Sequence, residues 1–281
     1  MRVTVWGCRG SLPTPGRDTV RYGGNTSCLE VELANGSMLV LDAGTGICAL
    51  GKKLQRRNVR RIQLLLTHLH LDHVEGLRFF EPLWDDQVEI DIWGPPSPVV
   101  SLRERIARSF SPPLFPIEIA EVPARVNFID VPREQWVLAG ASLWAETIVH
   151  PGPTVGYRIE TVDGTLAYLP DHEPALTGTI SRRSRDWISG ASLAAGADLL
   201  VHDAQFSAEE YSQRVGWGHS SSADAIAYGT AVGAERILLF HHDPNHDDVW
   251  LDESEERAEL LAGSNGIAPT LAREGMVLAL S

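Results

Sequence analysis

Apolar positions along this chain repeat with two different periods. Segments with alternating or nearly continuous apolar residues predict strands over residues 2–6, 27–33, 38–42, 61–66 and 88–93. Asn35-Gly36 predicts a hairpin turn between the second and third of these strands. Apolar residues recur at helical spacing over 47–57, and helical patterns begin within 74–84 and 99–109.

The second half of the chain shows the same two periods. Strands are predicted over residues 142–149, 155–161, 166–169, 198–201, 236–240 and 276–280. Helices are predicted over 185–195 and 221–232. The stretch 111–135 is rich in proline and poor in pattern, which favours a loop or lid.

Strands in meanders followed by strand–helix pairs occur in both halves of the chain. This order predicts an α/β fold in which two sheets pack face to face with helices outside. No segment has the composition of a linker, so we expect residues 1–281 to form a single domain.

Composition limits the class of protein. The chain has 281 residues, of which 43% are hydrophobic, which is enough for a large buried core. No apolar run approaches the roughly 18 residues that cross a bilayer, and the N-terminus has no secretory pattern. We therefore expect a cytoplasmic protein with no membrane partner. Cys8, Cys28 and Cys48 are odd in number and form no CxxC pair, which favours reduced thiols over a disulfide or zinc–thiolate site.

The formal net charge of −13 opposes binding to long nucleic acids, whose phosphates usually meet a basic patch. Lys and Arg gather in two stretches. Residues 52–61 end a predicted helix, where cations favour the dipole, so we interpret them as a solvated helix end. Arg182, Arg183 and Arg185 form the other stretch.

The strongest chemical signal is the motif His68-x-His70-x-Asp72-His73, directly after a predicted buried strand. Three imidazoles and a carboxylate within six residues would make a poor core, because a buried polar group is costly unless it is paired. A metal ion resolves this problem. Imidazole and carboxylate ligands without thiolate suit Zn, Mn, Fe or Ni.

Three residues further along the chain are candidates for additional ligands. His150, Asp171 and His241 each follow a predicted strand. A single His in that position is more often a hydrogen-bonded structural residue. Three such residues, all at C-terminal strand ends, favour a shared metal site.

One superfamily has its ligands in this order. The ligand set of the metallo-β-lactamase superfamily resembles His68, His70, Asp72, His73, His150, Asp171 and His241. The segment 238–244 is similar to the last motif of that superfamily, in which the first His after the strand is the ligand, here His241 and not His242. The resemblance covers most of the chain and implies a four-layer αββα sandwich with two mixed sheets.

The resemblance also implies two divalent metal ions, with zinc expected and manganese or iron as alternatives. The ions would be held by His68, His70 and His150 at one position and by Asp72, His73 and His241 at the other. Asp171 would bridge them together with a water or hydroxide, and Asp72 would also orient the nucleophile. Two cations about 3.5–4 Å apart lower the pKa of a bridging water and stabilise charge on the reacting oxygens.

A second resemblance narrows the reaction. The segments 199–206 and 218–221 look like motifs of ribonuclease Z-type phosphodiesterases, which typically have Glu where this chain has Asp203. The resemblance implies that His219 is a general acid or phosphate-binding group and that Asp203 orients it. The structural alternative is that His219 merely precedes a helix whose N-cap is Ser220 or Ser221.

The opening of the chain is similar to bacterial proteins of a cyclic-nucleotide phosphodiesterase-like branch. Its glycine-rich segments 6–15 and 21–28 either line a phosphate pocket or form tight turns. Ribonuclease Z enzymes usually carry a long arm that grips tRNA, whereas the stretch from Asp171 to His202 is short. Together with the net charge, this favours a small-molecule phosphodiester over tRNA. The resemblance also implies a homodimer.

Three functions follow from these residues. The first is a phosphodiesterase acting on cyclic nucleotides or other small phosphodiesters. The second is a hydrolase of lactone, thioester or β-lactam bonds, which would use the same metals without His219. The third is a non-catalytic metal-binding module, which the full ligand set disfavours. Residues 44–49 fit a dinucleotide pattern but lack the later acidic residue, so we interpret them as a strand-to-helix turn, with Asp42 buttressing the site.

Overall fold

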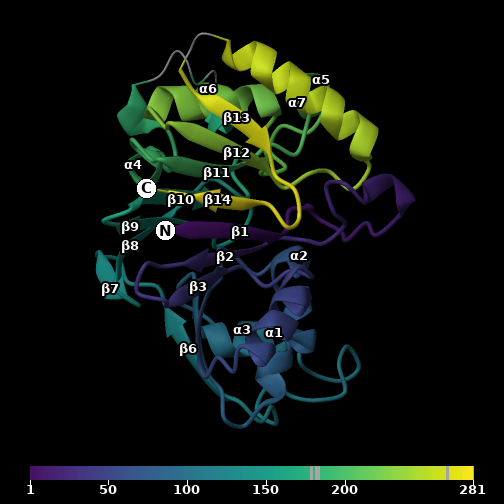
Figure 1. Ribbon diagram of the computed structural model, residues 1–281, viewed down its shortest axis with the longest axis vertical. Coiled ribbons are helices and arrows are strands. Elements are labelled where there is room, and N and C mark those ends of the chain that lie inside the picture. Colours follow the sequence, from purple (N-terminus) through teal and green to yellow (C-terminus); the bar gives the residue numbers. More distant parts are fainter. Residues whose placement is uncertain (178–179, 181–183, 264–265, 281) are drawn as a thin grey trace.

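Two β-sheets pack face to face, and helices cover both outer faces (Figure 1). The structure is a computed structural model that describes residues 1–177, 180, 184–263 and 266–280. This arrangement confirms the predicted four-layer α/β sandwich with two mixed sheets. Among the helices described in these ranges, none is long and apolar enough to cross a membrane.

The first sheet is antiparallel on one side and parallel on the other. Its strands are β1 (Arg2–Gly7), β2 (Cys28–Glu32), β3 (Met38–Leu41), β4 (Arg61–Leu65), β5 (Glu89–Gly94), β6 (Arg125–Asp130) and β14 (Val277–Ala279). Their order is β14-β1-β2-β3-β4-β5-β6. The pairs from β14 to β3 are antiparallel, and those from β3 to β6 are parallel.

The second sheet has the same division. Its strands are β7 (Trp136–Leu138), β8 (Ala141–Thr147), β9 (Val155–Thr161), β10 (Gly164–Leu169), β11 (Leu199–Asp203), β12 (Arg236–Phe240) and β13 (Ala268–Leu271). The order is β13-β12-β11-β10-β9-β8-β7, parallel from β13 to β10 and antiparallel beyond. Because parallel strands end at the same edge, several strand termini of each sheet come together there.

Three apolar clusters fill the spaces between the four layers. The central one joins the inner faces of the two sheets and includes Val5, Leu29, Tyr157 and Phe240. The other two lie between each sheet and its helices. All three cysteines are free, and Cys8 and Cys28 are buried.

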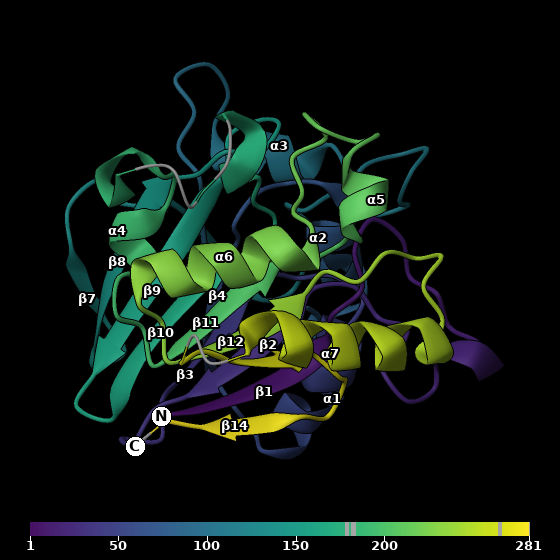
Figure 2. The ribbon, with the colours of Figure 1, turned by 90° about the horizontal axis from the view of Figure 1, so that it is seen from above.

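Side-chain caps mark where the two longest of the described helices begin. On the second sheet lie α4 (Ala191–Ala194), α6 (Ser222–Val232) and α7 (Asp248–Ala262), with α5 (Ala208–Tyr211) nearby; on the first lie α1 (Ile47–Arg56), α2 (Leu71–Val74) and α3 (Leu102–Ala107). The hydroxyl of Ser221 accepts from the backbone N–H of Asp224 and so caps α6. In the same way, the carboxylate of Asp247 caps α7. Figure 2 shows α6 and α7 side by side across the sheet.

Several predicted elements differ from the structure. The helical pattern at 74–84 yields only the last residue of α2 and two 3-10 turns, η2 (Glu75–Phe79) and η3 (Glu81–Trp84). Pro82 has no N–H to continue a helix. The helix predicted over 185–195 is also wrong: η6 (Arg185–Trp187) and α4 are separated by Gly190, whose φ of 67° lies in the left-handed region.

The proline-rich stretch 111–135 is not a loop throughout. Residues 125–130 form β6, the edge strand of the first sheet. Its residues are only partly buried because it pairs on one side alone, so the sequence lacks the apolar run of a central strand. The sequence also made no prediction for α5, α7, β13, η1 (Arg17–Thr19) or η4 (Pro174–Thr177).

Candidate metal centre

The HxHxDH motif lies where the chain leaves β4 and enters α2. His68 and His70 precede the helix, and Asp72 and His73 lie within its single turn. His68, Asp72 and His73 are buried, whereas His70 is exposed. This short strand-to-helix connection therefore brings four donor groups to one edge of the first sheet.

Three residues at strand ends of the second sheet reach the same place. His150 follows β8, Asp171 follows β10 and His241 follows β12. The ligand atoms lie within 4.8 Å of one another in each of two groups: His68, His70, His150 and Asp171, and Asp72, His73, Asp171 and His241. The structure thus brings together all seven residues that the sequence predicts as ligands.

The orientation of His73 is set by a carboxylate behind it. Nδ1 of His73 hydrogen-bonds to Oδ2 of Asp42 at 2.8 Å. Donation from Nδ1 leaves a lone pair on Nε2, which lies 2.9 Å from Oδ1 of Asp171. A lone pair and a carboxylate oxygen repel at this distance unless a proton or a metal cation lies between them. The pair therefore requires positive charge.

Asp42 also anchors the chain around the motif. Its carboxylate accepts hydrogen bonds from the backbone N–H of Thr67 at 2.8 Å and from the Tyr168 hydroxyl at 2.9 Å. These contacts confirm the expectation that Asp42 buttresses the site. Residues 44–46 form the turn into α1, as interpreted from the sequence.

The group around His150 shows a similar need for a cation. Nδ1 of His150 hydrogen-bonds to the carbonyl oxygen of Gly218 at 2.7 Å. Its Nε2 then faces Nδ1 of His70 at 3.2 Å. Nε2 of His68 is buried and has no hydrogen-bond partner among the described residues. Unpaired buried polar atoms cost about 1–3 kcal/mol each, which a bound cation would offset.

These donors fit a divalent metal ion. The groups contain only imidazole nitrogens and carboxylate oxygens, a set that suits zinc and its neighbours in the first transition row. The carboxylate of Asp42 behind His73, and the carbonyl of Gly218 behind His150, are the kind of supporting contacts that orient metal-binding histidines.

Burial and nearby carboxylates act on the histidines in opposite directions. Burial lowers the pKa of His150 to about 4 and also lowers the pKa of His68 well below its ordinary value. Burial opposes the charged form of His241 as well, but Asp171 and Asp72 outweigh it and raise the pKa of His241 to about 9. In the metal-free protein, His150 is therefore ready to bind a metal at neutral pH, while His241 holds a proton.

The structure distinguishes His241 from its neighbour. Nε2 of His241 lies 3.2 Å from carboxylate oxygens of both Asp72 and Asp171. The ring of His242 points elsewhere and hydrogen-bonds to the carbonyl oxygen of Ala272 at 2.8 Å. Gly10 packs against His241 so closely that a Cβ there would lie 2.3 Å from Nδ1 of the ring.

His219 and Asp203 form the predicted pair. Nδ1 of His219 hydrogen-bonds to Oδ2 of Asp203 at 2.7 Å, and the two rings of His219 and His241 stack with centroids 4.8 Å apart. The Asp203 carboxylate also accepts from the backbone N–H of Ser220 at 3.1 Å. Ser221 caps α6, as the structural interpretation of this segment requires. The structure therefore agrees with that interpretation as well as with a functional role for His219.

The glycine-rich opening supports the site through its backbone. The backbone N–H of Ser11 donates to Oδ2 of Asp72 at 2.7 Å, a contact that the sequence did not predict. Arg9 is fully buried, and its guanidinium donates to backbone carbonyls of Gly23 and His246. The opening segment thus forms tight turns that brace the centre, and the Arg9 side chain is engaged within the protein.

Glu173 is a second residue that sequence reasoning missed. It is buried, and its carboxylate accepts from the backbone N–H groups of Gly216 and Gly218, both at 2.7 Å. It therefore holds the segment whose carbonyl orients His150. Its position two residues after Asp171 is the signal that could have drawn attention to it.

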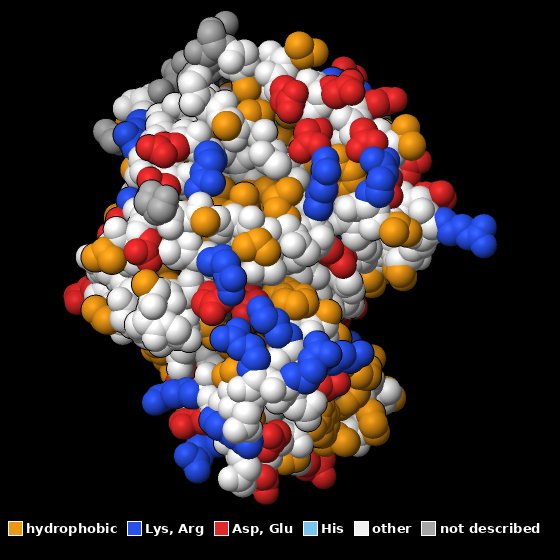
Figure 3. Space-filling view, in the orientation of Figure 1, with side chains coloured by type: hydrophobic (Ala, Val, Ile, Leu, Met, Phe, Trp, Pro, Cys, Tyr) orange, Lys and Arg blue, Asp and Glu red, His pale blue; other side chains and the backbone are white. Residues whose placement is uncertain are grey.

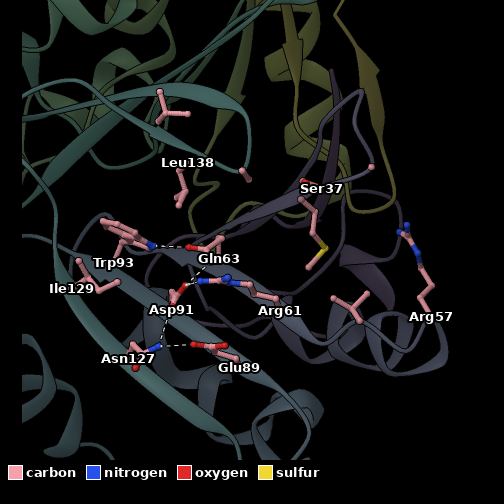
Figure 4. Close-up of a pocket in the computed structure, with 15 residues that line it drawn as sticks. Ser37, Arg57, Arg61, Gln63, Glu89, Asp91, Trp93, Asn127, Ile129 and Leu138 are labelled. Atoms are coloured by element: carbon pink, nitrogen blue, oxygen red, sulfur yellow. Dashed lines mark hydrogen bonds and ion pairs between the residues drawn. The ribbon is translucent and has the colours of Figure 1, made fainter.

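A separate cleft of about 640 Å³ lies elsewhere in the molecule (Figure 4). Its polar side chains bond to one another: the Asp91 carboxylate accepts from Gln63 at 2.6 Å and from Asn127 at 2.7 Å, and Trp93 donates to Gln63 at 2.8 Å. Arg61 on its wall begins β4, whereas the metal-site residues follow strand ends. The cleft is therefore at the opposite end of the first sheet.

Comparison with known proteins places this site in a family context. A family model described as a beta-lactamase superfamily domain matches residues 38–242. A relative named ribonuclease Z, from Streptococcus suis, is 26% identical over 272 residues, covering 78% of this chain and 84% of the relative.

Two solved structures have a similar fold. A diphosphatase from the PhnP family has a TM-score of 0.69 and 18% identity, covering 100% of this chain and 98% of that one. The short form of human tRNase Z has a TM-score of 0.65 and 21% identity, with 100% of both chains covered.

These relatives contradict the expectation that tRNA is disfavoured as a substrate, because the curated relative is a ribonuclease Z and a tRNase Z matches over the whole chain. The prediction rested in part on the net charge of −13, which does not report where individual cations lie. The local placement of cations decides where phosphates bind. Figure 3 shows Lys and Arg side chains gathered over the region of α1 despite the acidic total. Arg182 and Arg183 lie outside the described residues.

Proposed function

This chain belongs to the beta-lactamase superfamily, and from that premise we propose that it hydrolyses phosphodiester bonds with two divalent metal ions, zinc being the first expectation. The observation that carries the proposal is the His219–Asp203 pair, held at 2.7 Å beside the two groups of candidate ligands. A pair of this kind can supply a proton to a leaving oxygen.

The ligands divide into two sets around a shared carboxylate. We assign His68, His70 and His150 to one ion and Asp72, His73 and His241 to the other. Asp171 is suited to contact both, because its Oδ2 lies 3.8 Å from Nε2 of His150 and 3.2 Å from Nε2 of His241. Two divalent ions held there would lower the pKa of water and neutralise charge on the phosphate oxygens.

His219 is placed to handle the leaving group. Its Nδ1 is occupied by Asp203, so its Nε2 is the atom that can donate a proton. Asp203 cannot swing away easily, because Oδ1 accepts from the backbone N–H groups of Gln205 and Ser220. The shorter Asp thus reaches the ring without the extra methylene of Glu.

On the nucleophile side, Asp72 is the orienting group. The backbone N–H of Ser11 and the ring of His241 both contact its Oδ2, at 2.7 and 3.2 Å. Among the described residues, Oδ1 of Asp72 has no hydrogen-bond partner and could accept a hydrogen bond from an attacking water. Asp72 and His219 would therefore act at opposite ends of the bond that breaks.

Hydrolysis of lactones, thioesters or β-lactams on the same ligands is the second candidate. It would share all seven metal-site residues but would not require the His219–Asp203 pair. The likeness to a diphosphatase fold and the 26% identity to a ribonuclease Z both support phosphorus chemistry. The phosphodiester is either a cyclic nucleotide or a bond in RNA, since hydrolysis breaks a phosphodiester P–O bond in both.

The test begins with metal-stripped protein reloaded with zinc or manganese. Initial rates are measured on bis(p-nitrophenyl) phosphate, a 2′,3′-cyclic nucleotide, and a tRNA with a 3′ extension, alongside a lactone and a β-lactam. We expect metal-dependent hydrolysis of at least one phosphodiester and none of the lactone or β-lactam. The proposal would be overturned if the chain bound two metal ions and hydrolysed only the lactone or the β-lactam.

A further inference from the structure

A rigid loop stands beside the candidate metal centre. It spans residues 211–219 and ends at His219. The buried carboxylate of Glu173 receives three donors from it: the backbone N–H groups of Gly216 and Gly218 at 2.7 Å, and the Tyr211 hydroxyl at 3.0 Å. Charge-assisted hydrogen bonds of this kind fix a backbone in place.

The loop cannot move away from the centre without breaking further contacts. The carbonyl of Gly218 meets Nδ1 of His150 at 2.7 Å. Gly218 has a φ of 93°, and a Cβ on it would lie 2.1 Å from Pro151 and 2.5 Å from His150. The backbone of the loop is therefore held against His150, one of the candidate ligands.

One of those side chains is a large aromatic ring turned to solvent. Trp217 is 62% exposed although it is separated from His219 by only one residue. The guanidinium of Arg214 lies 6.0 Å from the Trp217 ring centroid and 4.9 Å from that of Phe206. The rings of Phe206 and His219 in turn meet in a T-shaped arrangement, with centroids 6.0 Å apart at 89°.

These contacts form a continuous series from the proton donor to the exposed surface, through His219, Phe206, Arg214 and Trp217. Among the described residues, no carboxylate pairs with Arg214, and its guanidinium donates one hydrogen bond, to the carbonyl oxygen of Glu210 at 3.3 Å. An unpaired cation is notable on a chain of net charge −13 and would attract an anion.

We propose that Trp217 and Arg214 form the subsite that binds the nucleobase and adjoining phosphate of a nucleotide-bearing substrate. An exposed indole offers a flat face on which any base can stack, and base–aromatic stacking is the usual way in which proteins hold unpaired nucleotides. Arg214 supplies a planar cation that both stacks and contacts phosphate oxygens. This subsite rests on the proposed phosphodiesterase function and gives it a substrate class.

The nucleotide can be free or can be the terminal nucleotide of an RNA, because both present an unpaired base next to the bond that breaks. A 2′,3′-cyclic nucleotide and a short RNA with a 3′ extension separate these two sources. If the variants described below change KM for only one of these two substrates, that substrate represents the class that the subsite binds.

The experiment uses the metal-loaded full chain and three variants. Trp217→Ala removes the ring, Trp217→Phe retains a smaller stacking face, and Val215→Ala alters an equally exposed position of the same loop, where Val215 is 54% exposed. We expect Trp217→Ala to raise KM for a nucleotide substrate about 5-fold to 150-fold, the range for loss of one base–aromatic stack. Trp217→Phe should recover most of that loss, and Val215→Ala should leave KM unchanged.

The base itself is the decisive control. KM for an abasic ribose cyclic phosphate should be the same for the unaltered protein and for Trp217→Ala, since there is no base to stack. Equal KM changes on the nucleotide and on its abasic analogue would overturn the subsite, as would an unchanged KM for the nucleotide.

Binding of AMP, measured by calorimetry, separates this inference from the proposed function. If no phosphodiester is hydrolysed but AMP binds and Trp217→Ala weakens it about 5-fold or more, the nucleobase subsite stands and the proposed activity falls. Hydrolysis of phosphodiesters together with AMP binding that is insensitive to Trp217→Ala and to Arg214→Gln would overturn the subsite alone.

Discussion

Asp42 and His73 are joined by a 2.8 Å hydrogen bond between Oδ2 and Nδ1, and both residues are fully buried. The two come from different strand ends of the first sheet, because Asp42 follows β3 and His73 lies on α2 after β4. This bond selects the nitrogen that His73 turns toward Asp171. The candidate metal centre therefore depends on a residue that would not touch the metal itself.

Replacing Asp42 with Asn should weaken metal binding, because an amide cannot carry the charge that strengthens His73 as a ligand. We expect a loss of about 10-fold to 100-fold in affinity, measured by competition with a chromophoric chelator. Tyr168→Phe is the matched control, since it removes another donor to the same carboxylate and leaves the His73 bond intact. Equal losses in both variants would contradict the role of the His73 contact.

Metal uptake should be coupled to proton release. Asp171 and Asp72 outweigh burial and raise the pKa of His241 to about 9, so in the metal-free protein this ring is protonated at pH 7. Metal affinity should rise about tenfold per pH unit from pH 7 and level off above the pKa of His241. Calorimetry in buffers of different ionisation enthalpy counts the protons, and a count of zero at pH 7 would refute this prediction.

The same raised pKa has a consequence for stability in the absence of metal. Because the folded-state pKa of His241 exceeds that of the unfolded chain, its ion pairs with Asp72 and Asp171 stabilise the metal-free fold fully below about pH 6.5. That stabilisation should decline as pH rises through 9. Denaturant unfolding of metal-free protein across this range, with His241→Asn as the control that lacks the decline, provides the measurement.

The role of His219 should depend on the leaving group. An alkoxide needs a proton as it departs, whereas p-nitrophenolate leaves readily without one. His219→Ala should therefore reduce kcat on a cyclic nucleotide by about 10²-fold to 10⁴-fold and much less on bis(p-nitrophenyl) phosphate. Metal content, measured in parallel, should stay the same. Identical losses on both substrates would argue against proton donation by His219.

Asp203→Asn offers a finer version of that test. The amide can still contact Nδ1 of His219 but does not favour the charged ring. We expect a smaller loss of kcat on the cyclic nucleotide than in His219→Ala, with the metal content unchanged. A kcat equal to that of the unaltered protein would show that Asp203 only holds the loop.

Gly10 should tolerate no side chain, because a Cβ there would lie 2.3 Å from Nδ1 of His241. Gly10→Ala should displace His241 and reduce the metal content from two ions to one per chain, measured by atomic emission. Gly16→Ala is a suitable control, since the nearest atom to a Cβ at Gly16 is 3.8 Å away. Full metal content in Gly10→Ala would show that His241 is not a required ligand.

The amino-acid sequence by itself determined the two-sheet architecture and the candidate ligands. Both are encoded locally: apolar alternation identifies a strand within a few residues, and the HxHxDH motif gathers four donors over six positions. Asp42 was also expected to buttress the site, beside the strand-to-helix turn at residues 44–49. The assignment of the seven candidate residues as metal ligands remains a prediction that the geometry supports.

Local pattern was misleading where neighbours decide the outcome. Residues 125–130 become a strand because β5 offers them an unpaired edge, and 185–195 fails as a helix because Gly190 takes a left-handed conformation. The acidic total charge likewise said little about phosphate binding, since affinity depends on where individual cations lie.

Only the tertiary structure decided which contacts hold the candidate ligands in place. The hydrogen bond from His150 to the carbonyl of Gly218 and the one from Gly218 to the carboxylate of Glu173 both join residues far apart in the chain. Such contacts arise when strand ends of two sheets meet at one edge. Sequence spacing carries no record of them, because it reports neighbours along the chain and the site is built from neighbours across it.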